Sequence, residues 1–296
     1  MKDNSIQNGP VVIGGIGGSG TRVIAEILRN LNFYIGNDLN DSVDNLIYTL
    51  LFKRRKWFYK NRNNRKIIYR GLNILEKVMT GRRSFSVPEY IFILNAAVSM
   101  SRHGHNMERN GSGLWPMKRV AKIFNSVQFN IHTYAGWGWK EPNSHLLIDY
   151  MNDFFPNFKY IYATRNGLDM AFSQNQQQLF NWGPLFGVDL PKTDHDIPLA
   201  SFRYWVKANR LALEKWENLG PKRFFWINYD QLCLDPKTEI RKLFSFLEVD
   251  VDEDIFRKCA ELPKIASSTG RFKNHDISGF DHEDLMFLKS LNFEIY

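Results

Sequence analysis

The sequence predicts an α/β fold with a central, mainly parallel sheet flanked by helices. Three short apolar runs, at 11–16, 159–164 and 223–228, have strand character, and each is followed by a segment with helical spacing. Strands separated by helices favour parallel pairing through crossover connections. The 296 residues, 44% of them hydrophobic and 24% charged, suit one large domain with a core of its own.

The remaining elements follow from local patterns along the chain. A short strand at 33–35 follows the first helix at 21–32, and a loop is expected at 104–113. Asp235 caps the helix that starts at Pro236. Further helices are expected at 43–51, 67–79, 90–100, 117–129, about 168–179, 200–219 and 236–248. Because no repeat or linker is present, we expect one domain over 1–296, with a helical insertion around 40–135.

The chain is basic, with a net charge of +8. Nine Lys or Arg and no acid fall within 53–70. This balance suits an anionic partner, such as nucleotide phosphates, an acidic glycan, nucleic acid or a membrane surface, without choosing among them.

Cysteine usage and hydropathy favour a soluble, cytoplasmic protein. Cys233 and Cys259 show no metal-ligand spacing and suit reduced thiols, although a disulfide between them stays open. The first ten residues are polar, and no stretch of about 18 apolar residues occurs. A binding partner in a membrane remains compatible with these observations.

A glycine-rich loop joins the first strand to the first helix, where residues 14–22 read GGIGGSGTR. Glycines let backbone N–H groups approach a phosphate, the helix N-terminus adds partial positive charge, and Ser19 and Thr21 add hydroxyl donors. A Walker A loop would need Lys and Ser or Thr after Gly20. A plain tight turn and a dinucleotide loop, whose GxGxxG spacing is present, remain alternatives.

A second loop follows the strand at 159–164, where 159–173 read KYIYATRNGLDMAFS. Arg165 stands just past the strand end, and Ser173 lies eight residues later on the expected helix. Ligands of open α/β sheets bind beyond the strand carboxyl ends, and an arginine there can fork onto a phosphate. The alternative is an ion pair between Arg165 and Asp169.

These two loops together resemble the PAPS-dependent sulfotransferases, where PAPS is 3′-phosphoadenosine-5′-phosphosulfate. Tyrosylprotein and glycan sulfotransferases are the nearest resemblance. It runs in islands over 11–273, and it implies a P-loop-like three-layer fold that uses PAPS as the sulfuryl donor. It departs at Gly18, where the family usually has Lys or Arg. The helical insertion around 40–135, most of which lies outside these islands, would form the acceptor side.

The resemblance implies a set of nucleotide-binding residues. The first loop would hold the 5′-phosphosulfate, Arg165 and Ser173 would clamp the 3′-phosphate, Tyr229 in INYDQLCLDP would help, and 268–273 would close over the nucleotide. The implied binding residues are Gly17, Gly18, Ser19, Gly20, Thr21, Arg22, Arg165, Ser173, Tyr229, Ser268, Thr269, Gly270, Arg271 and Lys273.

The same resemblance implies three catalytic residues. Lys140, in GWGWKEP, would stabilise charge near the bridging oxygen with help from the Ser268 hydroxyl. Asp38, in Gly-Asn-Asp, would take the acceptor proton. Other candidate bases are Asp41, Asp44, His103, His105 and His132.

We therefore expect a sulfotransferase that acts on an acceptor hydroxyl, on a carbohydrate or glycolipid, without a metal and without nucleic acid as partner. A P-loop kinase or other nucleotide phosphotransferase is an alternative, which would bind ATP and require Mg²⁺. A non-catalytic polyanion-binding module that uses the basic block at 53–70 is another.

Overall fold

The computed structural model describes residues 9–82, 84–104, 113–125 and 128–295. The chain divides into two compact units, which are described separately. Unit 1 comprises Met1–Gly14 and Ile24–Tyr160, and unit 2 comprises Gly15–Val23 and Ile161–Tyr296. In the described ranges, five strands form one sheet in the order β2-β3-β1-β4-β5, and β3 pairs in parallel with both β1 and β2. The predicted α/β class is confirmed.

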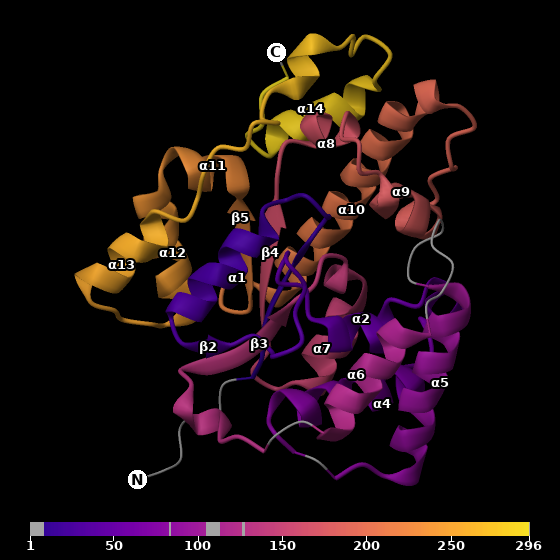
Figure 1. The fold of residues 1–296 in the computed structure, drawn as a ribbon. Coiled ribbons are helices and arrows are strands. Elements are labelled where there is room, and N and C mark those ends of the chain that lie inside the picture. Colours follow the sequence, from indigo (N-terminus) through magenta and orange to yellow (C-terminus); the bar gives the residue numbers. More distant parts are fainter. Residues whose placement is uncertain (1–8, 83, 105–112, 126–127, 296) are drawn as a thin grey trace. The chain divides into compact units, whose positions relative to one another are not determined.

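Unit 1 combines strands with a cluster of helices (Figure 1). Its elements are β1 (Val11–Gly15), most of α1 (Thr21–Asn30), β2 (Phe33–Tyr34), α2 (Leu46–Phe52), α3 (Arg55–Asn61), α4 (Arg65–Met79), α5 (Val87–His103), α6 (Leu114–Asn125), η1 (Ile131–Thr133), β3 (Gly136–Lys140), η2 (Ser144–Leu147) and α7 (Ile148–Phe154).

Helix α2 is the centre of the helical cluster. All seven of its residues are buried, and it packs against α4, α5 and α6, which Figure 1 shows around it. The helix begins at Leu46, three residues later than predicted, because Val43 has a φ of 63° and the Asn45 side chain caps the helix by accepting from the Tyr48 N–H at 2.9 Å. The helix predicted at 117–129 runs earlier, from Leu114 to Asn125.

Strand β3 is an element that the sequence analysis did not predict. It pairs with β1 with Val11 opposite Gly138, and a Cβ at Gly138 would collide with the Val11 carbonyl oxygen. The neighbouring Trp137 and Trp139 are buried. Its Trp-Gly alternation lacks the β-branched residues by which strands are usually predicted, so packing of the two indoles outweighs local propensity.

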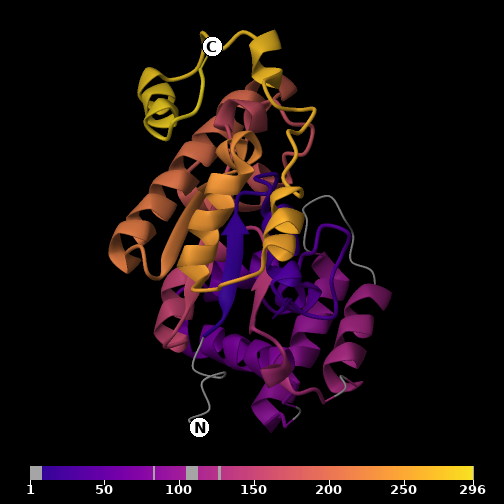
Figure 2. The same cartoon turned by 90° about the vertical axis from the view of Figure 1, so that its left-hand side faces the viewer.

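Unit 2 contains the loop at 15–20, most of β4, and the C-terminal elements. In both views α10 runs along β5 (Figures 1 and 2). Its elements are β4 (Lys159–Thr164), α8 (Gly167–Ala171), α9 (Gln177–Trp182), η3 (Gly183–Phe186), η4 (Asp194–Asp196), α10 (Ile197–Leu219), β5 (Phe224–Asn228), α11 (Tyr229–Leu234), α12 (Pro236–Leu247), α13 (Glu253–Ala260), η5 (Arg271–Asn274) and α14 (His282–Ser290).

The single helix predicted at 168–179 is wrong, because α8 ends at Ala171 and α9 starts at Gln177. The Gln176 amide explains the break. Its Nε2 donates to the carbonyl oxygens of Met170, Ala171 and Ser173 at 3.1, 2.9 and 2.6 Å, and so satisfies groups that a continuous helix would bond internally. Ser173 consequently lies between two helices and not on one.

Both cysteines are free thiols, Cys259 buried and Cys233 half-buried.

No helix in the described ranges is long and apolar enough to cross a membrane. Most of the loop predicted at 104–113, and with it His105, lies outside the described residues.

We predict that His145, in unit 1, makes the protein acid-sensitive. Burial lowers the pKa of this imidazole from 6.5 to about 4, so as the pH falls through this window the unfolded state binds a proton that the folded state excludes. The free energy of unfolding should fall by about 3 kcal/mol between pH 7 and pH 4 on this account alone.

Denaturant melts at both pH values test this, with His145→Gln, which does not titrate, as the comparison. The variant should lose less stability on acidification than the wild type. An equal loss in both proteins would contradict the role of His145.

Candidate active site

The glycine-rich loop occupies unit 2 and ends at the N-terminus of α1. Gly18 and Gly20 have φ angles of 94° and 79°, which side chains other than glycine rarely adopt. The Ser19 N–H donates to the Ile16 carbonyl oxygen at 3.2 Å and closes the turn. Ser19 and Thr21, the two predicted hydroxyl donors, are 1% and 4% exposed, whereas Arg22 is exposed on the first turn of α1.

The Tyr229 ring packs against this loop at Gly20. A Cβ at Gly20 would collide with the Tyr229 ring, so the glycine lets the loop rest on the aromatic face. The Tyr229 hydroxyl donates to the Lys264 carbonyl oxygen at 3.2 Å, and burial is the main reason that its pKa rises to about 12. Tyr229 is therefore a neutral platform for the loop.

One cavity of about 60 Å³ joins the two predicted phosphate loops. It is lined by Gly17 and Gly18 of the first loop, by Arg165 and Ser173 of the second, and by Arg271. Residues 150 positions apart in the sequence thus share one concave surface with two guanidinium groups. Such a surface suits a phosphate-type anion.

Arg165 is held firmly at this cavity. Its Nη2 donates to the Thr269 hydroxyl at 2.9 Å, its Nε lies 3.6 Å from an Asp230 carboxylate oxygen, and its own backbone carbonyl accepts from the Trp205 indole N–H at 3.1 Å. The ion pair with Asp169 that the sequence allowed is present at 3.9 Å. Arg165 also lines the cavity. The ion pair with Asp169 and a contact with a bound phosphate are therefore compatible.

Asp169 is a positioning residue that sequence reasoning treated only as an ion-pair partner. Its carboxylate is buried on α8 and accepts from the backbone N–H groups of Gly270 and Phe272 at 2.8 and 3.3 Å. The loop is further held by Arg271, whose Nη1 donates to the Phe172 carbonyl oxygen at 3.3 Å. In the sequence, the position of Asp169 four residues after Arg165 was the signal that could have indicated this positioning role.

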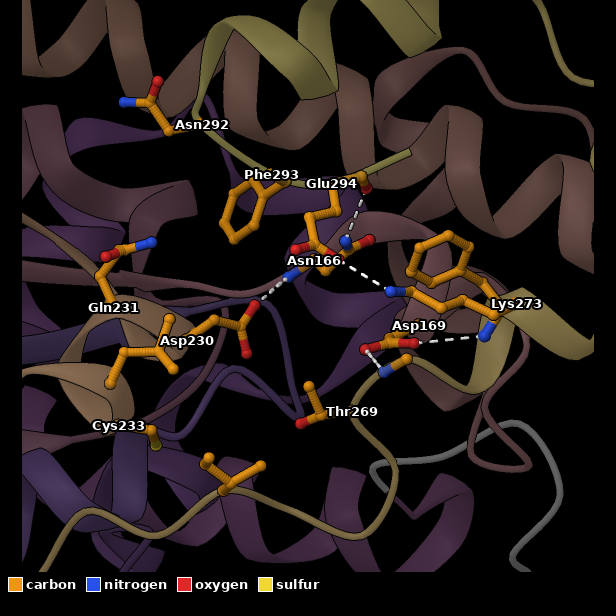
Figure 3. Close-up of a pocket in the computed structure, with 14 residues that line it drawn as sticks. Asn166, Asp169, Asp230, Gln231, Cys233, Thr269, Lys273, Asn292, Phe293 and Glu294 are labelled. Atoms are coloured by element: carbon orange, nitrogen blue, oxygen red, sulfur yellow. Dashed lines mark hydrogen bonds and ion pairs between the residues drawn. The ribbon is translucent and has the colours of Figure 1, made fainter. Parts of the chain in front are cut away.

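A second, larger cavity of about 380 Å³ is lined in part by the same loop, through Thr269 and Lys273 (Figure 3). Lys273 lines this cavity and not the one that contains Arg165, and its Nζ pairs with the Glu294 carboxylate at 2.9 Å. Figure 3 shows Asp230 accepting from the Asn166 backbone N–H, at 3.1 Å. Lys273 therefore lies outside the lining of the cavity that Arg165, Ser173 and Arg271 share.

In unit 1, Lys140 stands at the carboxyl end of β3 and is 2% exposed. Its Nζ contacts the Asp44 carboxylate and donates to the Ser42 carbonyl oxygen at 2.9 Å. The neighbouring Glu141 is fully buried and pairs with Lys53 Nζ at 2.6 Å. These contacts attach the segment 42–53 to the carboxyl end of β3.

Asp38, also in unit 1, is 2% exposed and bonded to two cations of α6. It accepts from Lys122 Nζ at 2.6 Å, and Arg119 Nε lies 3.2 Å from its other oxygen. Among the alternative bases, Asp44 is held by Lys140, while Asp41, His103 and His132 are exposed. Within the described ranges, no group of three His, Cys, Asp or Glu could hold a metal ion.

Comparison with known proteins identifies the family. The sulfotransferase family model matches residues 10–253. The chain therefore belongs to the sulfotransferase family.

Individual relatives are distant. A protein-tyrosine sulfotransferase A of Caenorhabditis elegans is 25% identical over 116 residues, which are 39% of this chain and 28% of that protein. An uncharacterised protein of Aquifex aeolicus is 30% identical over 103 residues, 34% of this chain and 12% of that protein. A sulfotransferase domain from the curacin biosynthetic pathway, 16% identical, aligns over 98% of this chain and 99% of its own with a TM-score of 0.49.

We predict that Gly20→Ala destabilises the loop more than Gly18→Ala. Both positions have positive φ, which costs an alanine roughly 1–2 kcal/mol. At Gly20 the new methyl also meets the Tyr229 ring, whereas at Gly18 the nearest atom outside the loop is Met170 Cε at 3.9 Å. Denaturant melts should show about 2–4 kcal/mol for Gly20→Ala and about half of that for Gly18→Ala. Equal losses would contradict the platform role of Tyr229.

Proposed function

We propose that this protein transfers the sulfuryl group of PAPS to an acceptor hydroxyl on a carbohydrate or glycolipid. Family membership supports sulfuryl transfer in general. The observation that carries the choice of donor is the cavity of unit 2, where loop glycines meet Arg165, Ser173 and Arg271. A donor with phosphate groups at both ends of its ribose needs two anion-binding loops, and the two loops that line this cavity support such a role.

The reaction requires the acceptor oxygen to attack sulfur in line. A new sulfur–oxygen bond forms while the bond from sulfur to the bridging phosphate oxygen breaks, and the bisphosphate leaves with the bonding electrons. The acceptor proton passes to a base. The loop amides and the hydroxyls of Ser19 and Thr21 would hold the phosphosulfate, and cations would offset the charge that gathers on the leaving phosphate.

Lys140 is our proposed cation at the leaving oxygen, with the Ser268 hydroxyl as a further donor. Its ammonium group is buried and held by Asp44 and the Ser42 carbonyl, so its direction is fixed before substrate arrives. A fixed cation costs little reorganisation in the transition state. Gly18, where the family usually has a lysine or arginine, leaves this role to a cation from another segment.

Asp38 is our proposed base. Its carboxylate is 2% exposed and lies between Lys122 Nζ, at 2.6 Å, and Arg119 Nε, at 3.2 Å, so its position is fixed before the acceptor arrives. Lys122, which is 51% exposed, would be the cation that meets the sulfated product.

The acceptor class rests on the basic block at 53–70. Lys53 and Arg54 serve the core: Lys53 pairs with Glu141, and Arg54 donates to the Leu51 carbonyl oxygen and lies over the Trp57 ring. The exposed remainder supports an anionic glycan or glycolipid acceptor. These exposed cations are Lys56, Lys60, Arg62, Arg65 and Lys66.

We predict that Arg165→Ala lowers affinity for 3′,5′-adenosine bisphosphate by about ten- to a hundred-fold, because one charge-assisted bond is lost. Affinity for AMP, which lacks the 3′-phosphate, should barely change. Calorimetric titration of both nucleotides checks this, with Arg257→Ala, an exposed arginine of α13, as the control. An equal loss for both nucleotides would refute the 3′-phosphate assignment, and preference of the wild type for ATP would favour a kinase.

We predict that Lys140→Ala cuts kcat by about a hundred- to a thousand-fold, the usual cost of one transition-state donor. PAPS affinity should change much less, because the interaction strengthens as charge develops. The double variant Lys140→Ala/Asp44→Asn separates folding from catalysis: it removes the orphaned carboxylate and should regain stability but not turnover. Near-normal turnover in Lys140→Ala, together with collapse in Arg22→Ala, would assign the role to Arg22.

We predict that Asp38→Asn lowers kcat by about a hundred-fold or more and removes the acidic limb of the pH–rate profile. Asp41→Asn, an exposed neighbour, should leave both unchanged. If Asp38 only anchors α6, the variant will melt at lower temperature while its remaining activity keeps the acidic limb. The pH–rate profile thus distinguishes a base from an anchor.

A further inference from the structure

Helix α5 presents apolar side chains on its exposed side as well as on its buried side. Phe92, Ile93 and Met100 face the core of unit 1. The opposite side carries Val87, Ile91, Leu94 and Val98, between 48% and 71% exposed. A helix that is apolar on all sides is normally buried on all sides. An exposed apolar face of this kind indicates a surface that contacts another molecule.

Helix α6 extends the same surface. The rings of Tyr90 and Phe124 lie 5.2 Å apart, so the start of α5 meets the end of α6 and the two packed helices run antiparallel. Leu94 and Val98 follow Tyr90 at steps of four residues, which places them on the same side of α5. On α6, Leu114 and Met117 are 76% and 54% exposed. We call these exposed apolar residues of the two helices the α5–α6 face.

The exposed charges of α5 and α6 have one sign. Glu89 is the only acid in either helix, and it is buried and paired with Lys77 at 2.8 Å. The exposed charged side chains of the two helices are Arg102, Lys118 and Lys122, and the basic side chain of His103 is exposed as well. A second copy docked on this face through a two-fold axis would bring these cations against their own copies, which disfavours a homodimer.

We propose that the α5–α6 face binds an anionic lipid surface. Apolar side chains flanked by lysine and arginine are the composition by which a protein lies in the interface of an acidic membrane, with the apolar groups at the acyl boundary and the cations among the headgroups. No helix in the described ranges could span the bilayer, so the contact is peripheral. The proposal does not rest on the proposed reaction.

Vesicle flotation with the full chain tests it. The wild type should float with vesicles of equal parts phosphatidylcholine and phosphatidylglycerol, and much less with phosphatidylcholine alone. The variant Leu94→Glu/Met117→Glu should bind at least about tenfold more weakly, because two apolar groups are replaced by acids at the lipid boundary. Met286→Glu, 42% exposed on α14, is the matched control and should bind like the wild type.

A charge variant tests the electrostatic part. Lys118→Glu should reduce binding to the acidic vesicles about fivefold or more, and Lys258→Glu on α13, also exposed, should not. Thermal melts confirm that each variant is folded. No flotation of the wild type, equal binding by the α5–α6 variants, or a wild-type dimer that these variants dissociate would overturn the proposal.

Discussion

The carboxylate of Asp169 holds the loop at 268–273 in place, and the shape of the cavity that contains Arg165 depends on that contact. Two backbone N–H groups of the loop bond to it, and the Thr269 hydroxyl in turn meets the Arg165 guanidinium. A buried carboxylate is stable only when its oxygens are satisfied, so the loop and the carboxylate stabilise each other. The same arrangement places two acids near Arg165, which limits how much positive charge the cavity offers an anion.

Buried charge has a similar function in unit 1, where it binds segments to the carboxyl end of β3. Lys140 and Glu141, which are adjacent in the sequence, each pair with a side chain of opposite charge, Asp44 and Lys53 respectively. Removing one member of such a pair leaves an uncompensated charge, which is usually more harmful than removing both. A catalytic role for Lys140 would therefore be superimposed on a structural one, and activity assays alone would not distinguish them.

Sequence patterns predicted the fold class, the helices of ten or more residues and the strands with β-branched or aromatic runs, because these depend on local periodicity. They missed β3, whose Trp-Gly alternation is stabilised by packing, and the break after Ala171, which depends on one glutamine side chain. Arg165 and Ser173 line one cavity together with the glycine loop, and their role toward a nucleotide stays a prediction. The cation partners of Asp38 and the position of Lys273 outside the lining of that cavity could not be predicted, since they depend on contacts between segments distant in the sequence.

The indole of Trp205 has a practical consequence. Its N–H donates to the Arg165 backbone carbonyl, its ring is buried, and it lines the small cavity with Gly18 and Arg271. The emission of a buried indole responds to nearby charge and to changes in its hydrogen bond. This side chain is thus an intrinsic fluorophore beside the proposed anion-binding cavity, suited to following ligand arrival in stopped-flow experiments without a label.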